Sequence, residues 1–362
     1  MEEILTHLAV GLPALGYRAD VVALQPGPLI ARLREAGVPT RLISAGRLRQ
    51  PHNVLRTVAR LARLVHTGGY DLVYSNMATA HLYAALGARA TRTPALWCQS
   101  GFPDPPGLMD RAATVLPAKG VIALSREAVA SQERMVPRRR VYLMHPGIDL
   151  GRYRVRRDLA LRAAHGLPAN APLVSIVGRL QPWKGQQEFL EAAARVRQAH
   201  PECRFAVVGG AILGWEGDYP ARLEAQARKL GLADAVFTGH TSEVNRWMAA
   251  SDIVVNASSP EPFGLVVVEA LASGCAVIAI DRGGPRDIIE NGHSGLLCAT
   301  REPSELARAI GRLIKDEPLR ARLGHHGRSR VERDFTREAM IQRFAMIVAD
   351  ATATRRGTET AA

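Results

Sequence analysis

The sequence is poor in the residues that stabilise secreted proteins or hold structural metals. Its 362 residues include only four cysteines, which are far apart and form no Cys-x-x-Cys pair. This argues against a disulfide framework or a zinc site and favours the cytosol. No apolar run reaches the roughly 18–20 residues of a membrane span. Residues 1–10 also lack the basic and then apolar order of a signal peptide, so we expect a cytoplasmic protein.

Lysine is scarce as well, whereas arginine is abundant. The formal net charge is +13, from 47 Lys and Arg against 34 Asp and Glu. Residues 1–150 carry 18 of these cations against 10 acids, and residues 151–362 carry 29 against 24. A basic protein favours nucleic acid, anionic membranes or phosphate-rich substrates as partners, although an arginine bias also follows from a GC-rich genome. Since the sequence shows no helix-turn-helix, RNA-binding aromatic motif or zinc finger, we do not expect nucleic acid as a partner.

Short apolar runs rich in Val, Ile and Ala alternate with helical patterns along almost the whole chain. Such runs are typical of parallel strands covered on both faces. The alternation predicts an α/β fold with doubly wound sheets. The expected strands are residues 19–24, 40–44, 71–75, 94–98, 120–124 and 140–144 in the first half, and 172–178, 203–209, 234–239, 252–257, 275–280 and 294–298 in the second.

The alternation is interrupted at residues 148–170, a stretch punctuated by Arg, Gly and Pro. We place a linker there, between a Rossmann-like domain of residues 1–147 and a second of residues 171–336. Two such domains would face each other across a cleft at the carboxyl ends of their strands, where these sheets bind ligands. A final helix over residues 337–352 is expected to pack back toward the first domain, and residues 353–362 to form a disordered tail.

The chain opens on an amphipathic helix and not on a strand. Ile4, Leu5, Leu8, Leu12 and Leu15 share its apolar face. A doubly wound domain normally begins with a strand and a glycine-rich turn. We therefore hypothesise a start site assigned too late or a truncated gene. If the chain starts at Met1, we expect its first sheet to lack a central strand and to expose apolar edges.

Residues 175–185, SIVGRLQPWKG, predict a strand, a glycine turn and the start of a helix. Arg179 and Lys184 lie in the turn. A glycine turn, two cations and helix N-terminal amides together form a good diphosphate cradle. Two cations that neutralise a diphosphate remove the need for a metal, so no metal or cofactor is expected. The alternative interpretation is a pair of surface cations flanking a loop. Gly209 lies in a second glycine-rich strand end, residues 207–214, which is weak evidence by itself.

Two carboxylates lie around a helix start in residues 258–274, SSPEPFGLVVVEALASG. Glu261 precedes a helix expected over residues 264–273, and Glu269 lies on that helix. The helix is apolar almost all round, which predicts that Glu269 lies in a buried region facing the cleft. A carboxylate accepts paired hydrogen bonds from vicinal hydroxyls, as in the recognition of sugar or ribose. The alternative is two ordinary acids, one near a helix N-terminus and one on a solvated face.

These motifs, in this order, resemble the family 4 retaining glycosyltransferases, which have the GT-B fold. The resemblance rests on Glu261 and Glu269 as the ends of an E-x7-E spacing, together with GRLQPWKG, DIVVNAS, GCAVIAIDRGGPRDII and NGHSGLL. It is strongest over residues 173–300. It implies a metal-independent enzyme that transfers a hexose-type sugar, with retention, from a nucleotide-diphosphate sugar. The second domain would bind this donor, and the first a saccharide or lipid-linked acceptor in polysaccharide, glycolipid or glycoconjugate biosynthesis.

The resemblance also implies roles by position. Arg179 and Lys184 match the pair that binds the donor's diphosphate. Glu261 matches the acid that contacts the hydroxyls of the transferred sugar, and Glu269 matches the acid that holds the ribose. The candidate catalytic residues are therefore Arg179, Lys184 and Glu261. The full candidate donor site comprises Gly178, Arg179, Lys184, Gly209, Thr238, Glu261, Pro262, Phe263, Gly264, Leu265, Val266 and Glu269.

The candidate acceptor residues lie at two expected strand ends of the first domain: Asn76, Gln99, Ser100 and Gly101. Family members often place a His at the second of these strand ends, and many begin with a strand and a Gly-Gly loop. This sequence shows neither feature, so the alternative hypothesis is a non-catalytic nucleotide-sugar-binding homologue that acts as a partner subunit. The basic first domain suits an anionic or lipid-linked acceptor and peripheral contact with the anionic inner membrane face.

Overall fold

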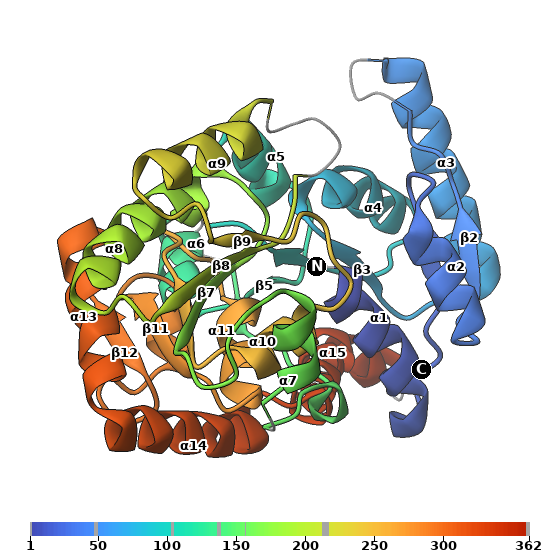
Figure 1. The fold of residues 1–362 in the computed structure, drawn as a ribbon. Coiled ribbons are helices and arrows are strands. Elements are labelled where there is room, and N and C mark those ends of the chain that lie inside the picture. The colour runs from blue at the N-terminus through green and yellow to red at the C-terminus, as the bar shows by residue number, and fades with distance from the viewer. Residues whose placement is uncertain are drawn as a thin grey trace. The chain divides into compact units, whose positions relative to one another are not determined.

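The structure is a computed structural model, and it describes residues 2–46, 50–102, 105–135, 139–155, 157–211 and 217–359, without the side chains of residues 354–359. The chain divides into two compact units, which are drawn in Figure 1. One consists of Met1–Gly147 with Arg337–Ala362, and the other of Ile148–Thr336. None of the described helices combines the length and the apolar character needed to cross a membrane.

The second unit contains a parallel sheet in which six described strands follow the order β12-β11-β10-β7-β8-β9. β8 and then β9 follow β7 on one side of the sheet. β10, β11 and β12 follow in turn on the other side of β7. The point where the order reverses, between β7 and β10, is where doubly wound sheets bind ligands. The strands agree with the predicted ranges: β7 (Leu173–Val177), β8 (Arg204–Val208), β9 (Val236–Phe237), β10 (Ile253–Asn256), β11 (Ala276–Ile280) and β12 (Leu296–Cys298).

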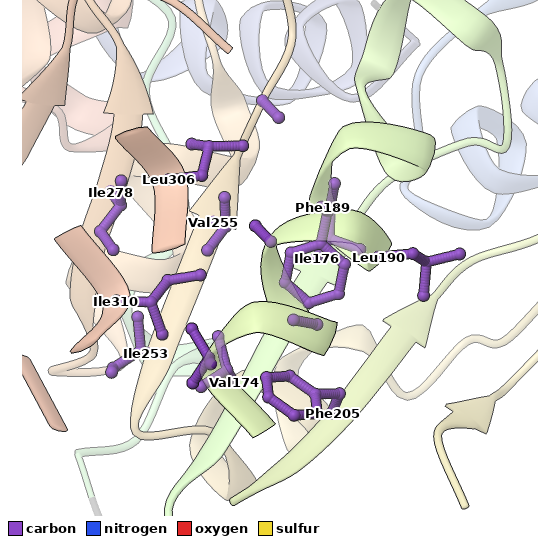
Figure 2. Packing of buried hydrophobic residues seen from close by; sticks show 14 of the residues in the cluster. Val174, Ile176, Phe189, Leu190, Phe205, Ile253, Val255, Ile278, Leu306 and Ile310 are labelled. Atoms are coloured by element: carbon purple, nitrogen blue, oxygen red, sulfur yellow. The ribbon is translucent and has the colours of Figure 1, made fainter. Parts of the chain in front are cut away.

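Helices cover both faces of this sheet (Figure 1). On one face, Val174 and Ile176 of β7 pack with Phe189 and Ile310 from two helices in the core shown in Figure 2. The next side chain along β7 points to the other face, where Ser175 Oγ lies 2.7 Å from Ser251 Oγ. Burial of each large apolar side chain contributes about 1.5–3 kcal/mol. The helices include α8 (Gln186–Ala199), α9 (Tyr219–Lys229), α10 (Val244–Ala250), α11 (Leu265–Ala272), α12 (Pro285–Ile288), α13 (Pro303–Lys315) and α14 (Glu317–Asp334), and a short helical turn, η3 (Pro182–Lys184), precedes α8.

Residues 148–170 are a folded part of the second unit and not the predicted linker. They contain η2 (Leu150–Arg152) and α7 (Leu159–Ala164). Arg162 of α7 is 1% exposed. Its guanidinium donates hydrogen bonds to Asp252 and to the carbonyls of Pro168, Ala169, Ala171 and Ala250. A buried guanidinium is tolerated only when its donors are paired. These polar contacts hold the segment in place together with the buried side chains of Leu161 and Leu167.

The described strands of the first unit form two separate sheets. β1 (Val21–Ala23) pairs with β2 (Thr40–Leu42). The other sheet is parallel and has the order β3 (Val73–Asn76), β4 (Ala95–Gln99), β5 (Gly120–Ala123) and β6 (Val141–Leu143). The helices of this unit include α1 (Glu2–Gly11), η1 (Leu12–Leu15), α2 (Pro28–Glu35), α3 (Pro51–Gly68), α4 (Ala78–Ala90), α5 (Leu108–Val115) and α6 (Arg126–Met135).

The last helix, α15 (Arg337–Glu359), belongs to the first unit although it ends the chain. The ring of Phe344 in this helix packs edge-on against the ring of Tyr74 in β3, with the ring centroids 4.8 Å apart. Its Asp350 forms an ion pair with Arg140 at 2.7 Å. The apolar residues expected to pack are buried: Met340, Ile341, Phe344 and Ile347. The helix continues past residue 352, where a disordered tail was expected, and residues 360–362 lie outside the described part.

Candidate functional site

Two loops meet at the point where the strand order of the second sheet reverses. One follows β7 and contains Gly185, and the other follows β10 and contains Ala257. A Cβ atom on Gly185 would lie only 2.6 Å from the Cβ and the carbonyl oxygen of Ala257. The backbone amide of Ser259 also donates a hydrogen bond to the carbonyl of Trp183 at 3.3 Å. The two loops, far apart in sequence, therefore form one continuous structure.

Lys184 and Glu261, both predicted as donor-site residues, form an ion pair between these loops. Lys184 Nζ lies 2.7 Å from Glu261 Oε2, and the two side chains are only 15% and 9% exposed. The ammonium also lies 4.0 Å from the centroid of the Trp183 ring. The pair places one cation and one carboxylate in a largely desolvated position. A ligand that carries both phosphate and hydroxyl groups has a complementary partner for each of them.

The loop after β11 holds Glu261 in position. Gly283 bridges Glu261 in parallel fashion, and the amide of Gly284 donates to the Glu261 carbonyl at 2.9 Å. Gly283 has a φ of 75°, and a Cβ atom on it would lie 2.1 Å from the Glu261 carbonyl oxygen. Only glycine combines this backbone conformation with so close an approach. The glycine turn in residues 281–289 therefore sets the place of the carboxylate.

Gly178 and Arg179 follow β7 directly. The Gly178 amide donates to the Val208 carbonyl at 2.9 Å, and Gln186 Nε2 donates to the Arg179 carbonyl at 2.8 Å. These bonds fix the backbone of the turn, while the Arg179 side chain is exposed. Among the described residues, no carboxylate lies within ion-pair distance of its guanidinium. Its charge is therefore available to an anionic ligand.

Gly209 and Thr238 lie at the neighbouring strand ends. The Gly209 amide donates to Thr238 Oγ1 at 3.0 Å, and the Thr238 hydroxyl donates to the Gly239 carbonyl at 2.9 Å. A Cβ atom on Gly209 would lie 2.1 Å from the Gly178 carbonyl oxygen. The structure thus brings these predicted donor residues together at the carboxyl edge of β7, β8 and β9. Residues 212–214 of the glycine-rich segment lie outside the described residues.

The remaining candidate donor residues lie at the start of α11. Gly264 caps the helix with a φ of 103°. Phe263 is buried, and its ring packs at 6.0 Å from that of Phe335, so its side chain belongs to the core. Glu269 is half-buried and less enclosed than predicted. Pro262, Leu265 and Val266 are also half-buried. The N-terminal backbone of such a helix is suited to bind oxygen atoms of an anion.

In the first unit, the candidate acceptor residues lie at the carboxyl ends of β3 and β4. Gln99 is buried, and its amide is used within the protein. Its Nε2 donates to Asp110 Oδ1 at 2.8 Å, and its Oε1 accepts a hydrogen bond from the Gly101 amide at 3.3 Å. Gln99 therefore shapes the loop that leads to α5 and does not present its amide to a ligand. Asn76 and Ser100 are half-buried and Gly101 is exposed at the same edge.

Two further groups near this edge, His81 and Cys98, are excluded as bases at neutral pH. Burial, with a smaller contribution from the charge of Arg139, lowers the pKa of His81 to about 4. His81 Nδ1 lies 3.0 Å from Ser75 Oγ, and the ring stacks on Trp97 with centroids 5.2 Å apart. Burial raises the pKa of the Cys98 thiol to about 12. The imidazole is therefore neutral and the thiol protonated.

The reversal in strand order, the glycine-lined strand ends and the cations beside them define the second unit as a Rossmann-like nucleotide-binding unit. Comparisons with known proteins identify the family. Residues 1–152 match the sequence model described as Glycosyltransferase Family 4, and residues 158–330 match Glycosyl transferases group 1. The chain belongs to the family 4-like glycosyltransferases and has the GT-B fold, with two Rossmann-like domains.

Solved structures and curated relatives agree with this placement. The structure of HepE from Anabaena in complex with UDP and glucose is 28% identical, covers 96% of this chain and 95% of that chain, and gives a TM-score of 0.85. The D-inositol 3-phosphate glycosyltransferase of Nocardioides sp. is 36% identical over 196 residues, and D-inositol 3-phosphate glycosyltransferase 2 of Catenulispora acidiphila is 38% identical over 199 residues. These alignments cover 51% and 53% of this chain but 43% and 46% of those proteins. The chain thus spans about half the length of the curated relatives it matches.

Proposed function

We propose that the protein is a metal-independent, retaining glycosyltransferase that moves a hexose-type sugar from a nucleotide-diphosphate donor to an acceptor. The observation that carries the proposal is the Lys184–Glu261 pair at the switch point of the second sheet, with Nζ and Oε2 2.7 Å apart. Structures of the similar Anabaena HepE contain UDP and UDP-glucose. UDP-glucose is therefore the first donor to test.

In the proposed complex, the donor separates the charges of this pair. The Lys184 ammonium and the Arg179 guanidinium bind the diphosphate. The Glu261 carboxylate accepts hydrogen bonds from hydroxyls of the sugar, and Glu269 accepts them from the ribose. Cations placed beside the diphosphate stabilise the negative charge that develops on it as it leaves. They supply this stabilisation without a metal ion.

The proposed transfer takes place on one face of the sugar. The bond between the anomeric carbon and the diphosphate oxygen breaks, and that oxygen keeps the electron pair. The acceptor hydroxyl oxygen bonds to the anomeric carbon from the same face, and its proton passes to the leaving diphosphate. This route suits a site in which neither His81 nor Cys98 accepts a proton at neutral pH.

The acceptor is proposed to be a saccharide or a lipid-linked molecule with negative charge. The support is electrostatic, because the first 150 residues carry 18 Lys and Arg against 10 Asp and Glu. A cytoplasmic enzyme with this charge would contact the anionic inner membrane face peripherally. Its retention on anionic vesicles should then fall as salt rises. A protein that vesicles fail to retain even at low salt would contradict the membrane part of the proposal.

The function is tested by incubating the purified protein with a panel of nucleotide-diphosphate sugars and measuring release of the nucleoside diphosphate. We expect one donor to be turned over, and Lys184→Ala to abolish the turnover. The anomeric configuration of the product, read by NMR, tests retention. A protein that binds one donor without turnover would instead be the non-catalytic partner subunit. A folded protein that binds no donor would contradict both functions.

A further inference from the structure

A cavity lies in the first unit, at the edge of the sheet opposite to the candidate acceptor residues. Its volume is about 450 Å³. Pro94 and Ala95 at the start of β4 and Lys119 just before β5 form part of its wall, together with Ala351 of α15. Pro94, Ala95 and Lys119 lie at the amino ends of their strands, whereas Gln99 ends β4. The cavity is therefore separate from the candidate acceptor site.

The charge of the wall is of one sign. Arg89, Arg92, Lys119 and Arg139 line the cavity, and no Asp or Glu does so among the described residues. Arg89 and Arg92 are exposed, and within the described chain neither has an ion-pair partner. The adjacent Arg140, in contrast, is paired with Asp350 at 2.7 Å. A wall that carries several cations, and no carboxylate among the described lining residues, focuses a positive potential on whatever enters.

Local structure fixes the backbone at Arg92 and the guanidinium of Arg139. Arg92 has a left-handed backbone with a φ of 57°, which is uncommon for a residue other than glycine. Its turn is fixed by the Thr93 amide, which donates to the Ala88 carbonyl at 2.9 Å. Arg139 is half-buried and donates from Nη1 to the Thr114 carbonyl. A guanidinium held as that of Arg139 is loses less conformational freedom when an anion binds.

The rest of the wall consists of small residues that are mostly apolar, with Thr93 and Thr352 as the polar ones. Ala85, Ala88, Ala95 and Ala118 contribute methyl groups, and Pro94 and Pro117 contribute rings. A cavity of about 450 Å³ is within the range of small-molecule sites and larger than a single inorganic ion requires. The lining thus suits a ligand with a strongly anionic group and an uncharged body.

We propose that this cavity binds a soluble organic phosphate, with the phosphate group held by Arg89, Arg92, Lys119 and Arg139 and the uncharged body resting on the alanine and proline wall. Phosphate is favoured over a single carboxylate because four cations line one cavity and a phosphate group carries up to two charges on three oxygens. The proposal does not depend on the proposed transferase activity, because no candidate donor or acceptor residue lines the cavity.

The test is calorimetric titration of the full chain with inorganic pyrophosphate at low salt. The Lys184→Ala background removes a cation of the candidate donor site and leaves the cavity intact. In this background we compare an Arg89→Ser/Arg92→Ser double variant with an Arg56→Ser/Arg60→Ser double variant. All four arginines are exposed in the same unit, and only the first pair lines the cavity. Arg139 is left unchanged because its bond to Thr114 supports the end of α5.

We expect Lys184→Ala protein to bind pyrophosphate, with affinity at least about tenfold weaker in Arg89→Ser/Arg92→Ser and unchanged in Arg56→Ser/Arg60→Ser. Thermal unfolding of each variant shows that the fold is kept. Absence of binding to the Lys184→Ala protein, or equal binding by both double variants, would overturn the proposal. Retention on phosphatidylglycerol vesicles that depends on Arg89 and Arg92, without pyrophosphate binding, would overturn it in favour of a membrane contact.

Discussion

Replacement of Glu261 by Gln should strengthen the binding of UDP while it weakens the binding of a UDP-sugar. In the free protein, the Lys184 ammonium is occupied by the Glu261 carboxylate at 2.7 Å. UDP carries the diphosphate but no sugar, so it competes with this carboxylate and gains nothing from it. A UDP-sugar loses the same competitor in Glu261→Gln, but it also loses the carboxylate proposed to bind its hydroxyls.

The size of the effect follows from the burial of the pair. At 2.7 Å and an effective dielectric constant of about 20, the Coulomb attraction is about 6 kcal/mol, most of which is offset by desolvation. With side chains 15% and 9% exposed, we take the net pairing as about 1–2 kcal/mol, between exposed and fully buried pairs. UDP should therefore bind about 5- to 30-fold more tightly to Glu261→Gln. Lys184→Met should bind UDP about 10- to 100-fold more weakly, through loss of one charge-assisted bond.

Calorimetric titration of the wild type and the two variants with UDP and with UDP-glucose measures these effects, and urea unfolding shows whether each variant remains folded. The reasoning requires opposite signs for the two variants with UDP. Weaker UDP binding by a folded Glu261→Gln would show that the carboxylate does not compete with the diphosphate. Unchanged UDP binding by Lys184→Met would show that the ammonium does not contact it.

Three further predictions concern stability and positioning. Burial lowers the pKa of His81 from 6.5 to about 4, so as the pH falls the imidazole is protonated in the unfolded chain before it is protonated in the folded protein. The free energy of unfolding should therefore drop by up to about 3 kcal/mol between pH 6.5 and 4. Urea unfolding of His81→Leu should not show this pH-dependent loss. Asp252→Asn leaves the buried Arg162 guanidinium without its carboxylate and should lower the free energy of unfolding by about 3–5 kcal/mol, whereas a loss below about 1 kcal/mol would contradict the assigned role. Gly283→Ala should displace Glu261 and so weaken UDP-glucose binding by at least about tenfold. Gly231→Ala is the control, because Gly231 has nearly the same φ but open space around it, and it should not weaken binding. Equal effects of the two variants would mean that backbone strain alone is responsible.

The sequence was informative where the cause of structure is local. Each short apolar run of the second half, such as residues 275–280, became a strand of the predicted sheet, because a strand covered on both faces needs little besides apolar side chains. The α/β fold and the family were predicted correctly on this basis. The segment 148–170 was mistaken for a linker because part of its order comes from contacts with distant residues, such as the bonds of the buried Arg162 to Ala250 and Asp252.

In the candidate site, too, the sequence indicated single residues but not the contacts between distant parts of the chain. The sequence indicated Lys184 and Glu261 as separate members of a site, but their contact depends on how two loops pack, which a one-dimensional pattern does not contain. It suggested Gln99 as an acceptor-binding residue, whereas the amide of Gln99 donates its hydrogen bond to Asp110 within the protein. The cavity lined by Arg89 and Arg92 was not predicted, because its residues come from several segments without a shared motif.

The most direct test of the account is a calorimetric titration with nucleotide-diphosphate sugars, in which wild-type protein is compared with Lys184→Ala and with Lys229→Ala. Lys229 is an exposed lysine at the end of α9 and is the matched control for loss of one positive charge. The account predicts saturable binding of one donor at one site, weakened at least about tenfold by Lys184→Ala and unaffected by Lys229→Ala. Absence of binding to a folded wild-type protein, or equal binding by the wild type and Lys184→Ala, would contradict it.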